Sequence, residues 1–175
     1  MTRVAALAAA ALAAACAVTP PPEPALPSLS AVPASFEMSG RLALRLGDRS
    51  EIARLRWMHS PGADRWVIAS PLGNEMARIE SGPAGATLAR AGAEPEQAAS
   101  FAELSERLLG VALEPTVLVG WLHGAGLERA AEWSVTVDES SKAGSVHISR
   151  RLTARRGEVT VRLVVDEYRS LDTPR

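Results

Sequence analysis

The chain has 175 residues, and its 19 Lys and Arg nearly balance its 20 Asp and Glu, for a formal net charge of -1. This balance gives no electrostatic reason to expect a nucleic-acid partner. A single cysteine excludes an internal disulfide, so packing must hold the fold, and the length suits one domain better than two.

Residues 1–15 have the pattern of a bacterial signal peptide. Thr2 and Arg3 form a short positive head, an apolar run follows, and residues 13–15 are all alanine. The run is shorter than the roughly 20 apolar residues that a membrane-spanning helix needs. We therefore expect this segment to be removed on export.

Cys16 follows the small residues directly, which is typical of a bacterial lipoprotein. Cleavage before Cys16 would leave its thiol and its new amino group to carry acyl chains such as palmitate. The usual lipoprotein signal has Leu three residues before the cysteine, where this chain has Ala13. Ordinary Ala-x-Ala cleavage, with Cys16 left as a free thiol, is therefore the alternative.

Residues 16–35 combine the lipidated cysteine with a proline-rich tether. Six prolines are interleaved here with Ala and Ser, and proline lacks the backbone donor that helices and sheets need. The segment is predicted to be an extended spacer that holds a domain, residues 36–170, away from a surface.

From residue 36 apolar and polar side chains alternate, which is the period of a β-strand. Further strands are predicted around residues 53–57, 66–69, 75–81 and 86–90, separated by short turns rich in Gly, Pro, Ser and Asp. This spacing predicts an antiparallel meander that curls into a barrel or half-barrel. The first predicted strand would place on one face Phe36, Met38, Leu42, Leu44 and Leu46.

The middle of the chain is predicted to be helical. Ser100 and Glu103 have the spacing of a capping box, and Gly110 is a natural helix stop. A second apolar helix is predicted after Pro115 and ends near Gly124. Strands return at residues 132–139, 145–153 and 158–168, so the predicted class is α+β, with helices that plug or line an incomplete barrel.

Catalytic patterns are absent from the sequence. The three histidines, His59, His123 and His147, are scattered and lack metal-ligand spacing. No nucleophile elbow, Ser-x-x-Lys pair or phosphate-binding glycine loop occurs. We therefore expect neither an enzyme nor a metal or cofactor site.

Several short motifs occur in a characteristic order behind the lipoprotein start. They are Phe36-x-x-x-Gly40-Arg41-Leu42-Ala43-Leu44, Ala53-x-Leu55-x-Trp57, Pro71-Leu72-Gly73, Leu109-Gly110 and Trp121-Leu122-x-Gly124. Together they resemble LolB, the outer-membrane lipoprotein receptor family of Gram-negative bacteria. The resemblance covers about residues 36–168.

The resemblance implies an incomplete antiparallel β-barrel, or half-barrel, that encloses a hydrophobic cavity with α-helices as its lid. It also implies an outer-membrane receptor, lipid-anchored and facing the periplasm. Such a receptor accepts acylated lipoproteins from the periplasmic carrier LolA and inserts them among outer-membrane phospholipids. Transfer would run downhill by affinity for apolar surroundings, without ATP or covalent chemistry, and we expect a monomer.

Two groups of site residues follow from this resemblance. The loop Pro71, Leu72 and Gly73 would present an exposed leucine to the membrane, although that leucine could instead fold back onto the barrel. The tryptophans could equally be ordinary core residues. The predicted lining of the acyl cavity consists of Leu44, Leu55, Trp57, Leu118, Trp121 and Leu122.

Two groups of surface arginines could be ordinary solvent-exposed residues or could bind a partner. Arg41 could meet a carrier's acidic rim, but a solvated surface arginine is the default. The arginines at 150, 151, 155 and 156 could face anionic headgroups, yet nearby acids favour a solvated hairpin. For the whole chain, the alternative function is a passive envelope lipoprotein with a scaffolding or interaction role.

Overall fold

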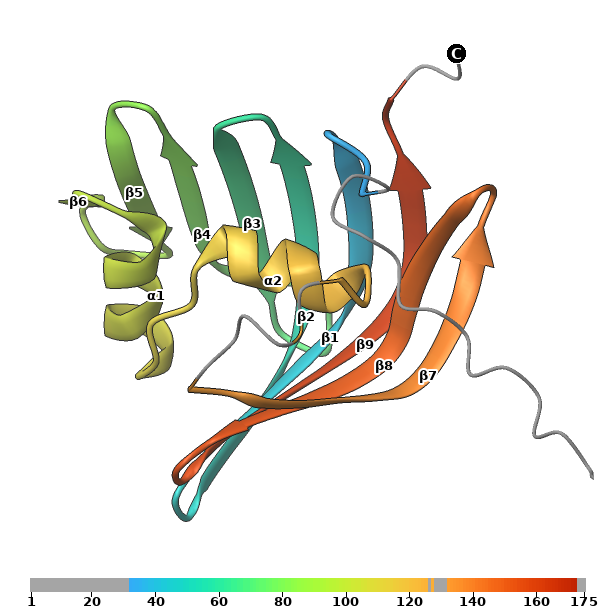
Figure 1. Ribbon diagram of the computed structural model, residues 1–175. Coiled ribbons are helices and arrows are strands. Elements are labelled where there is room, and N and C mark those ends of the chain that lie inside the picture. Colours follow the sequence, from blue (N-terminus) through green and yellow to red (C-terminus); the bar gives the residue numbers. More distant parts are fainter. Residues whose placement is uncertain (1–31, 126, 128–131, 173–175) are drawn as a thin grey trace, which may run out of the picture.

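The computed structural model describes residues 32–125, 127 and 132–172. Cys16, the signal peptide and most of the tether therefore lie outside the described residues. The described elements run from Phe36 to Ser170 and form one curved sheet with two helices against it (Figure 1).

Nine strands make a single antiparallel sheet in the order β6-β5-β4-β3-β2-β1-β9-β8-β7. The two edge strands of this order, β6 and β7, do not close on each other, so the barrel is incomplete, as the sequence predicted. The strands are β1 (Phe36–Leu46), β2 (Arg49–Ser60), β3 (Ala63–Ala69), β4 (Glu75–Gly82), β5 (Gly85–Arg90), β6 (Glu96–Ala98), β7 (Ser134–Ala143), β8 (Val146–Arg156) and β9 (Val159–Ser170).

The pairing of β1 with β9 joins the two ends of the chain. Its register shifts between Ser39 and Gly40, where a β-bulge interrupts the ladder. A Cβ atom on Gly40 would lie 2.1 Å from the carbonyl oxygen of Val164. Only glycine therefore permits the two backbones to approach this closely at the bulge.

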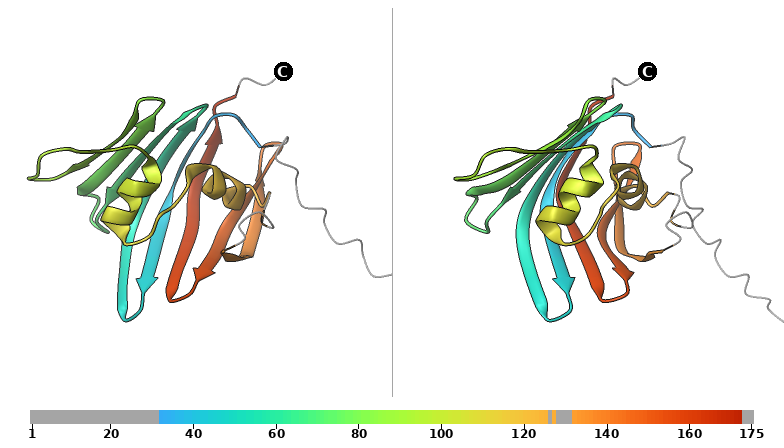
Figure 2. Two further views of the ribbon diagram at one scale, coloured as in Figure 1. Left: turned by 60° about the vertical axis from the view of Figure 1, so that its left-hand side comes forward. Right: turned by 90° about the vertical axis from the view of Figure 1, so that its left-hand side faces the viewer.

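Both helices lie on the concave side of the sheet (Figure 2). α1 (Phe101–Leu109) begins at the predicted N-cap, where the hydroxyl of Ser100 accepts from the N–H of Glu103. The Glu103 carboxylate reaches back as in a capping box but accepts from the N–H of Ala99, one residue before the N-cap. It ends at Gly110, which has a φ of 75°. The chain then crosses the sheet as α2 (Pro115–Leu122), whose first residue is a proline.

The core fills the space between the concave face and the helices. Alternate residues of the central strands point into it, so Trp57, Trp66 and Ile79 are almost completely buried while their strand neighbours face outward. Phe36 lies at one end of this core with the rings of Trp57 and His123 about it, at centroid distances of 5.0 and 5.2 Å.

The structure differs from the sequence-based expectations in element length. β6 has only three residues and was not predicted, and β7 to β9 are each longer than expected. Leu44 and Leu46 share the face of Leu42 but are half-buried and exposed, respectively, because only the end of α1 lies beside this part of the β1–β2 hairpin. No helix within the described residues is both long and apolar enough to cross a membrane.

Candidate functional site

A small apolar cavity of about 20 Å³ lies between α2 and the sheet. This is room for about one water molecule, whereas sites for small ligands measure about 300–1,000 Å³. A ligand of that size can therefore enter only if the lining side chains move apart. The lining side chains are all apolar or aromatic: Leu42, Leu55, Trp57, Trp66, Leu113, Leu118, Trp121, Leu152, Val161 and Leu163.

Four of the predicted lining residues, Leu55, Trp57, Leu118 and Trp121, lie in the wall of this cavity. The other two do not. Leu44 lies further along β1, in an open groove of about 250 Å³ that it shares with Leu46 and the end of α1. Leu122 is completely buried in the core but is not part of the cavity wall.

The tryptophans of the wall differ in their polar contacts. The indole N–H of Trp57 donates to the carboxylate of Asp64 at 2.7 Å. Those of Trp66 and Trp121 are buried and have no hydrogen-bond acceptor among the described residues. An unpaired buried donor costs about 1–3 kcal/mol, so a ligand that offers a carbonyl oxygen would recover part of that energy.

Asp64 is a buried carboxylate that sequence analysis missed. Its Oδ1 accepts from Trp57 and lies 2.8 Å from Nδ1 of His59. The three residues come from the β2–β3 hairpin and fix the orientation of the Trp57 ring, which forms part of the cavity wall. In the sequence, Asp64 follows a Pro-Gly turn and looks like an ordinary turn acid.

His123, at the end of α2, ties this helix to the sheet. Its Nδ1 lies 2.9 Å from the carbonyl oxygen of Val119, and its Nε2 lies 2.8 Å from the hydroxyl of Tyr168 on β9. Because a carbonyl only accepts, Nδ1 carries the proton and Nε2 accepts from the tyrosine. Burial lowers the pKa of His123 and raises the pKa of Tyr168.

Further hydrogen bonds hold the segment that carries α2. The hydroxyl of Ser149 on β8 donates to the carbonyl oxygen of Trp121 at 2.8 Å. Before the helix, the N–H of Leu113 donates to the hydroxyl of Ser105 on α1, also at 2.8 Å. The segment over the cavity is thus fixed near both of its ends.

The loop between β3 and β4 presents Leu72 to solvent, with 90% of its surface exposed. The carbonyl oxygen of Ser70 accepts from the N–H of Gly73 at 2.8 Å, and the N–H of Ser70 donates to the carbonyl oxygen of Asn74 at 2.8 Å. Gly73 has a φ of 93°, which favours glycine at this position of the turn. Leu72 does not fold back onto the sheet, and the loop is tied at its base.

Three of the four arginines that the sequence grouped near residues 150–156 have local partners. Arg150 donates to the backbone carbonyls of Val165 and Asp166, and Arg151 pairs with Glu139 at 3.2 Å. Arg156 pairs with Glu132 and stacks on a tryptophan ring. These contacts agree with the interpretation of a solvated hairpin. Within residues 32–125, 127 and 132–172, no three potential metal ligands come together.

Comparison with known proteins assigns the family. The model of the family "LolB: Outer membrane lipoprotein LolB" matches residues 34–132, more than half of the chain. Outer-membrane lipoprotein LolB of Chromobacterium violaceum is 32% identical over 159 residues, which cover 84% of this chain and 86% of that protein. The LolB proteins of Azoarcus sp. and Thiobacillus denitrificans are 28% and 29% identical and cover 87% and 97% of this chain.

Among solved structures, a LolA superfamily protein from Nitrosomonas europaea is similar with a TM-score of 0.45 and 9% sequence identity. The match covers 86% of this chain and 96% of that chain. The sequence relationships are much stronger, and they extend over nearly the full length of the relatives. The chain belongs to the LolB family of outer-membrane lipoproteins, which act in the localisation of lipoproteins at the outer membrane.

Proposed function

We propose that this protein is a receptor that accepts lipoproteins from the periplasmic carrier LolA, holds their acyl chains beneath α2 and releases them into the outer membrane. The observation that carries the proposal is the wholly apolar wall between α2 and the sheet. Such a wall offers nothing for catalysis but stabilises a hydrocarbon chain by about 0.8 kcal/mol for each buried CH₂ group.

Loading requires the small cavity to widen. The side chains of α2 contribute Leu118 and Trp121 to the wall, so moving this helix away from the sheet would expose the remaining lining residues together. The unpaired indole N–H groups of Trp66 and Trp121 would then be available to the ester carbonyls of an acylated cargo. The hydrogen bonds of Ser149 and His123 would keep the end of the helix in place.

Release is proposed to follow β1 into a groove of mixed lining, where leucines lie beside the charged Arg49, Glu51 and Arg107. Leu42 lies in the cavity wall, and Leu44 and Leu46 follow on the same strand face in the groove beside the end of α1. These residues lie toward the same end of the strands from which the loop with Leu72 projects. We propose that Leu72, with Pro71 and Gly73, enters the bilayer while an acyl chain leaves along this path.

Lipidation at Cys16, after removal of residues 1–15, would keep the receptor at its target membrane. The structure shortens the expected tether, because Ala34 and Ser35 donate to Asp172 and Val32 packs against the core. The remaining residues 16–31, if extended as polyproline, would span up to about 50 Å, enough for the domain to reach both a carrier and the bilayer. From the carrier to this protein and then to the bilayer, each acceptor would bury the acyl chain better than the one before it. The bilayer is the final acceptor.

A passive scaffolding lipoprotein is the second candidate, because the core is nearly filled in this closed form. The deciding experiment mixes the chain from residue 16 onward, carrying Cys16→Ala, with LolA loaded with a labelled lipoprotein. The receptor hypothesis expects the label to move to this protein and then to added vesicles. As a control, the same loaded carrier is mixed with another LolB protein, to which it should deliver the label. If it does so but keeps the label in the presence of this protein, the scaffold is the better interpretation.

A further inference from the structure

We propose that the outer face of the sheet around Arg41, Arg45, Arg54 and Arg162, here called the basic face, docks the protein on anionic phospholipid headgroups. The inference rests on the proposed function, because it assumes that this end of the molecule meets a bilayer. It adds a class of lipid that the surface recognises and assigns arginines to that recognition.

The strand register places these four arginines together. Arg41 on β1 lies directly opposite Arg54 on β2, and two residues further along, Ala43 lies between Ile52 on β2 and Arg162 on β9. Because every second residue of a strand faces the same side, Arg45 belongs to this face as well. The intervening residues of the same strands, such as Leu42 and Leu163, face the core.

Most of the basic face lacks neutralising partners. Arg41 pairs with Asp166 at 3.2 Å, but within the described part of the chain no carboxylate forms an ion pair with Arg45, Arg54 or Arg162. Like charges directly opposite one another destabilise a sheet. In a chain with a net charge of -1, this accumulation has no benefit for folding that the structure reveals.

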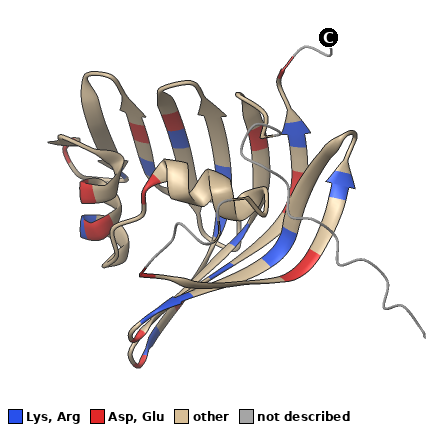
Figure 3. Cartoon of the chain, viewed as in Figure 1, with Lys and Arg blue, Asp and Glu red and all other residues tan. Residues whose placement is uncertain are grey.

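Other arginines on the same outer face, further from the β1–β2 hairpin turn, form ion pairs with carboxylates. Arg56 pairs with Glu37, Arg65 pairs with Glu80 at 2.6 Å, and Arg78 pairs with Glu75 at 2.7 Å. Charges of both signs are accordingly mixed along the strands (Figure 3). Two further acids of this outer face, Glu167 and Asp138, accept hydrogen bonds from Ser39 and Thr153 and form no ion pair with these arginines in the described residues. Asp48 is in the hairpin turn, and Glu51 is on the opposite side of β2.

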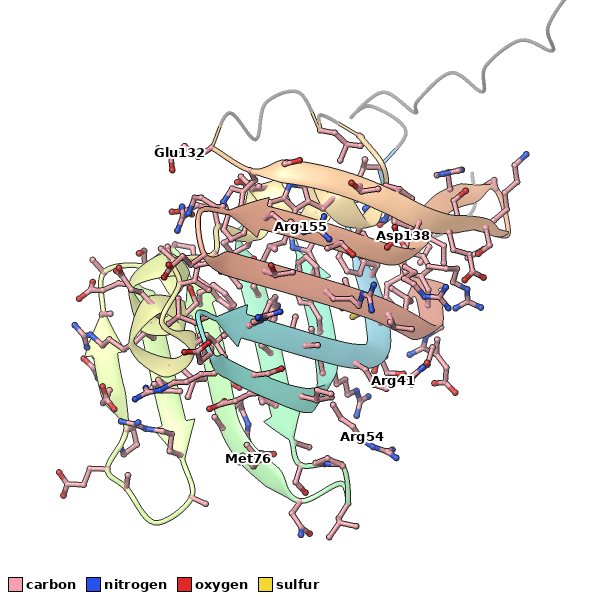
Figure 4. The ribbon with its side chains drawn as sticks, turned by 90° about the horizontal axis from the view of Figure 1, so that it is seen from below. Arg41, Arg54, Met76, Glu132, Asp138 and Arg155 are labelled. Atoms are coloured by element: carbon pink, nitrogen blue, oxygen red, sulfur yellow. The ribbon has the colours of Figure 1, made fainter. Side chains whose placement is uncertain are left out.

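Exposed apolar side chains gather at the same end. Of the six large hydrophobic residues that are exposed in the described structure, four lie toward the end of the sheet that carries the β1–β2 and β3–β4 turns: Leu46, Ile52, Leu72 and Met76. Ile52 is 63% exposed and stands among the arginines of the basic face. From below, Arg41, Arg54 and Met76 are seen along one side of the sheet (Figure 4).

Arginines around apolar tips are the combination that a charged bilayer surface favours. Guanidinium groups bind phosphate oxygens in a bidentate manner, and apolar side chains enter the boundary between headgroups and acyl chains. A negative surface attracts each nearby Arg or Lys strongly enough to change binding about five-fold. The basic face would thus orient the loop with Leu72 toward the lipid.

The test measures vesicle binding of the chain from residue 16 onward with Cys16→Ala, which has no lipid anchor. Vesicles of phosphatidylethanolamine with phosphatidylglycerol are compared with uncharged vesicles of phosphatidylethanolamine and phosphatidylcholine, by flotation at low and high salt. We expect tighter binding to the anionic vesicles, weakened by salt. Arg54→Gln and Arg162→Gln should each weaken binding about five-fold, and together about 25-fold.

Arg65→Gln is the matched control. It removes the same charge from the same outer face, but at the opposite end of the strands, toward the β2–β3 turn. It should leave vesicle binding unchanged. Equal binding to charged and uncharged vesicles, or an equal loss with Arg65→Gln, would overturn the proposal.

A second measurement, uptake of labelled cargo from LolA without vesicles, separates this inference from the proposed function. We expect Arg54→Gln with Arg162→Gln to accept cargo normally. If these variants lose uptake instead, the basic face binds the carrier and the lipid proposal is wrong. If the unsubstituted chain accepts no cargo but still prefers anionic vesicles, the receptor function fails and the docking surface stands.

Discussion

Replacing Leu72 with Glu tests whether the β3–β4 loop enters the membrane. Because 90% of the leucine surface is already exposed, the substitution removes little packing, and stability should change by no more than about 0.5 kcal/mol. The turn itself is held by backbone hydrogen bonds from Ser70 and by Gly73, which the substitution leaves in place.

The expected effect is on delivery. Full burial of a leucine gains about 1.5–3 kcal/mol, and nearly all of this surface is still available for insertion. Losing about 1.4 kcal/mol or more corresponds to at least a tenfold reduction in membrane binding. The carboxylate that Leu72→Glu introduces adds repulsion from anionic lipid, so the reduction should exceed that figure.

The assay loads Leu72→Glu with labelled lipoprotein from LolA and then follows the label into vesicles. Uptake should equal that of the unsubstituted protein, while transfer to vesicles should fall at least tenfold. Leu171→Glu is the matched control, since Leu171 is 45% exposed at the opposite end of the sheet. Normal delivery by Leu72→Glu, or an equal loss in Leu171→Glu, would refute the reasoning.

Three further predictions concern the core and its polar contacts. Leu152→Ala enlarges the cavity beneath α2, should cost about 2–5 kcal/mol in urea unfolding, and should allow a small apolar probe to bind; a cost below about 1 kcal/mol would contradict the packed wall. Asp64→Ala leaves the buried indole N–H of Trp57 unpaired and should lower the free energy of unfolding by about 1–3 kcal/mol. The double variant with Trp57→Phe should lose less stability than the two single variants added together. Simple additivity would argue against an interaction between Asp64 and Trp57. Because burial lowers the pKa of His123, the unfolded chain binds the proton more readily than the folded one, so the free energy of unfolding should fall as the pH drops through about 6.5 toward the lower folded pKa. His123→Gln should flatten this dependence of the free energy of unfolding on pH. An equally steep curve in the variant would assign the dependence to another group.

Local patterns in the sequence were sufficient to predict most of the elements and the turns between them. The period of two from Phe36 onward, the capping box at Ser100 and the glycine stop at Gly110 each concern residues within a few positions of one another. The order of strands, helices and strands then indicated an incomplete barrel, which the sheet order confirms. β6 escaped prediction because three residues are too few to display a period.

The site was only partly accessible from the sequence. Of the lining residues that the resemblance implied, Leu55, Trp57, Leu118 and Trp121 lie in the cavity wall, and Leu44 and Leu122 do not. Periodicity identifies the face of a strand or helix and cannot tell how far along the element its neighbours still cover it. The cavity volume likewise depends on how side chains from several elements pack, which no local pattern records.

By itself the sequence determined the element types, the open antiparallel class, the position of the turn at Leu72 and the resemblance to LolB, while the exposure of Leu72 came from the structure. Tertiary structure alone decided that β1 pairs with β9, that His123 meets Tyr168 across 45 positions, and that Arg41 stands opposite Arg54. The physical reason is distance along the chain. Turns and helix caps are set by neighbours, whereas a buried polar pair or a surface charge cluster exists only once the strand register has brought remote residues together.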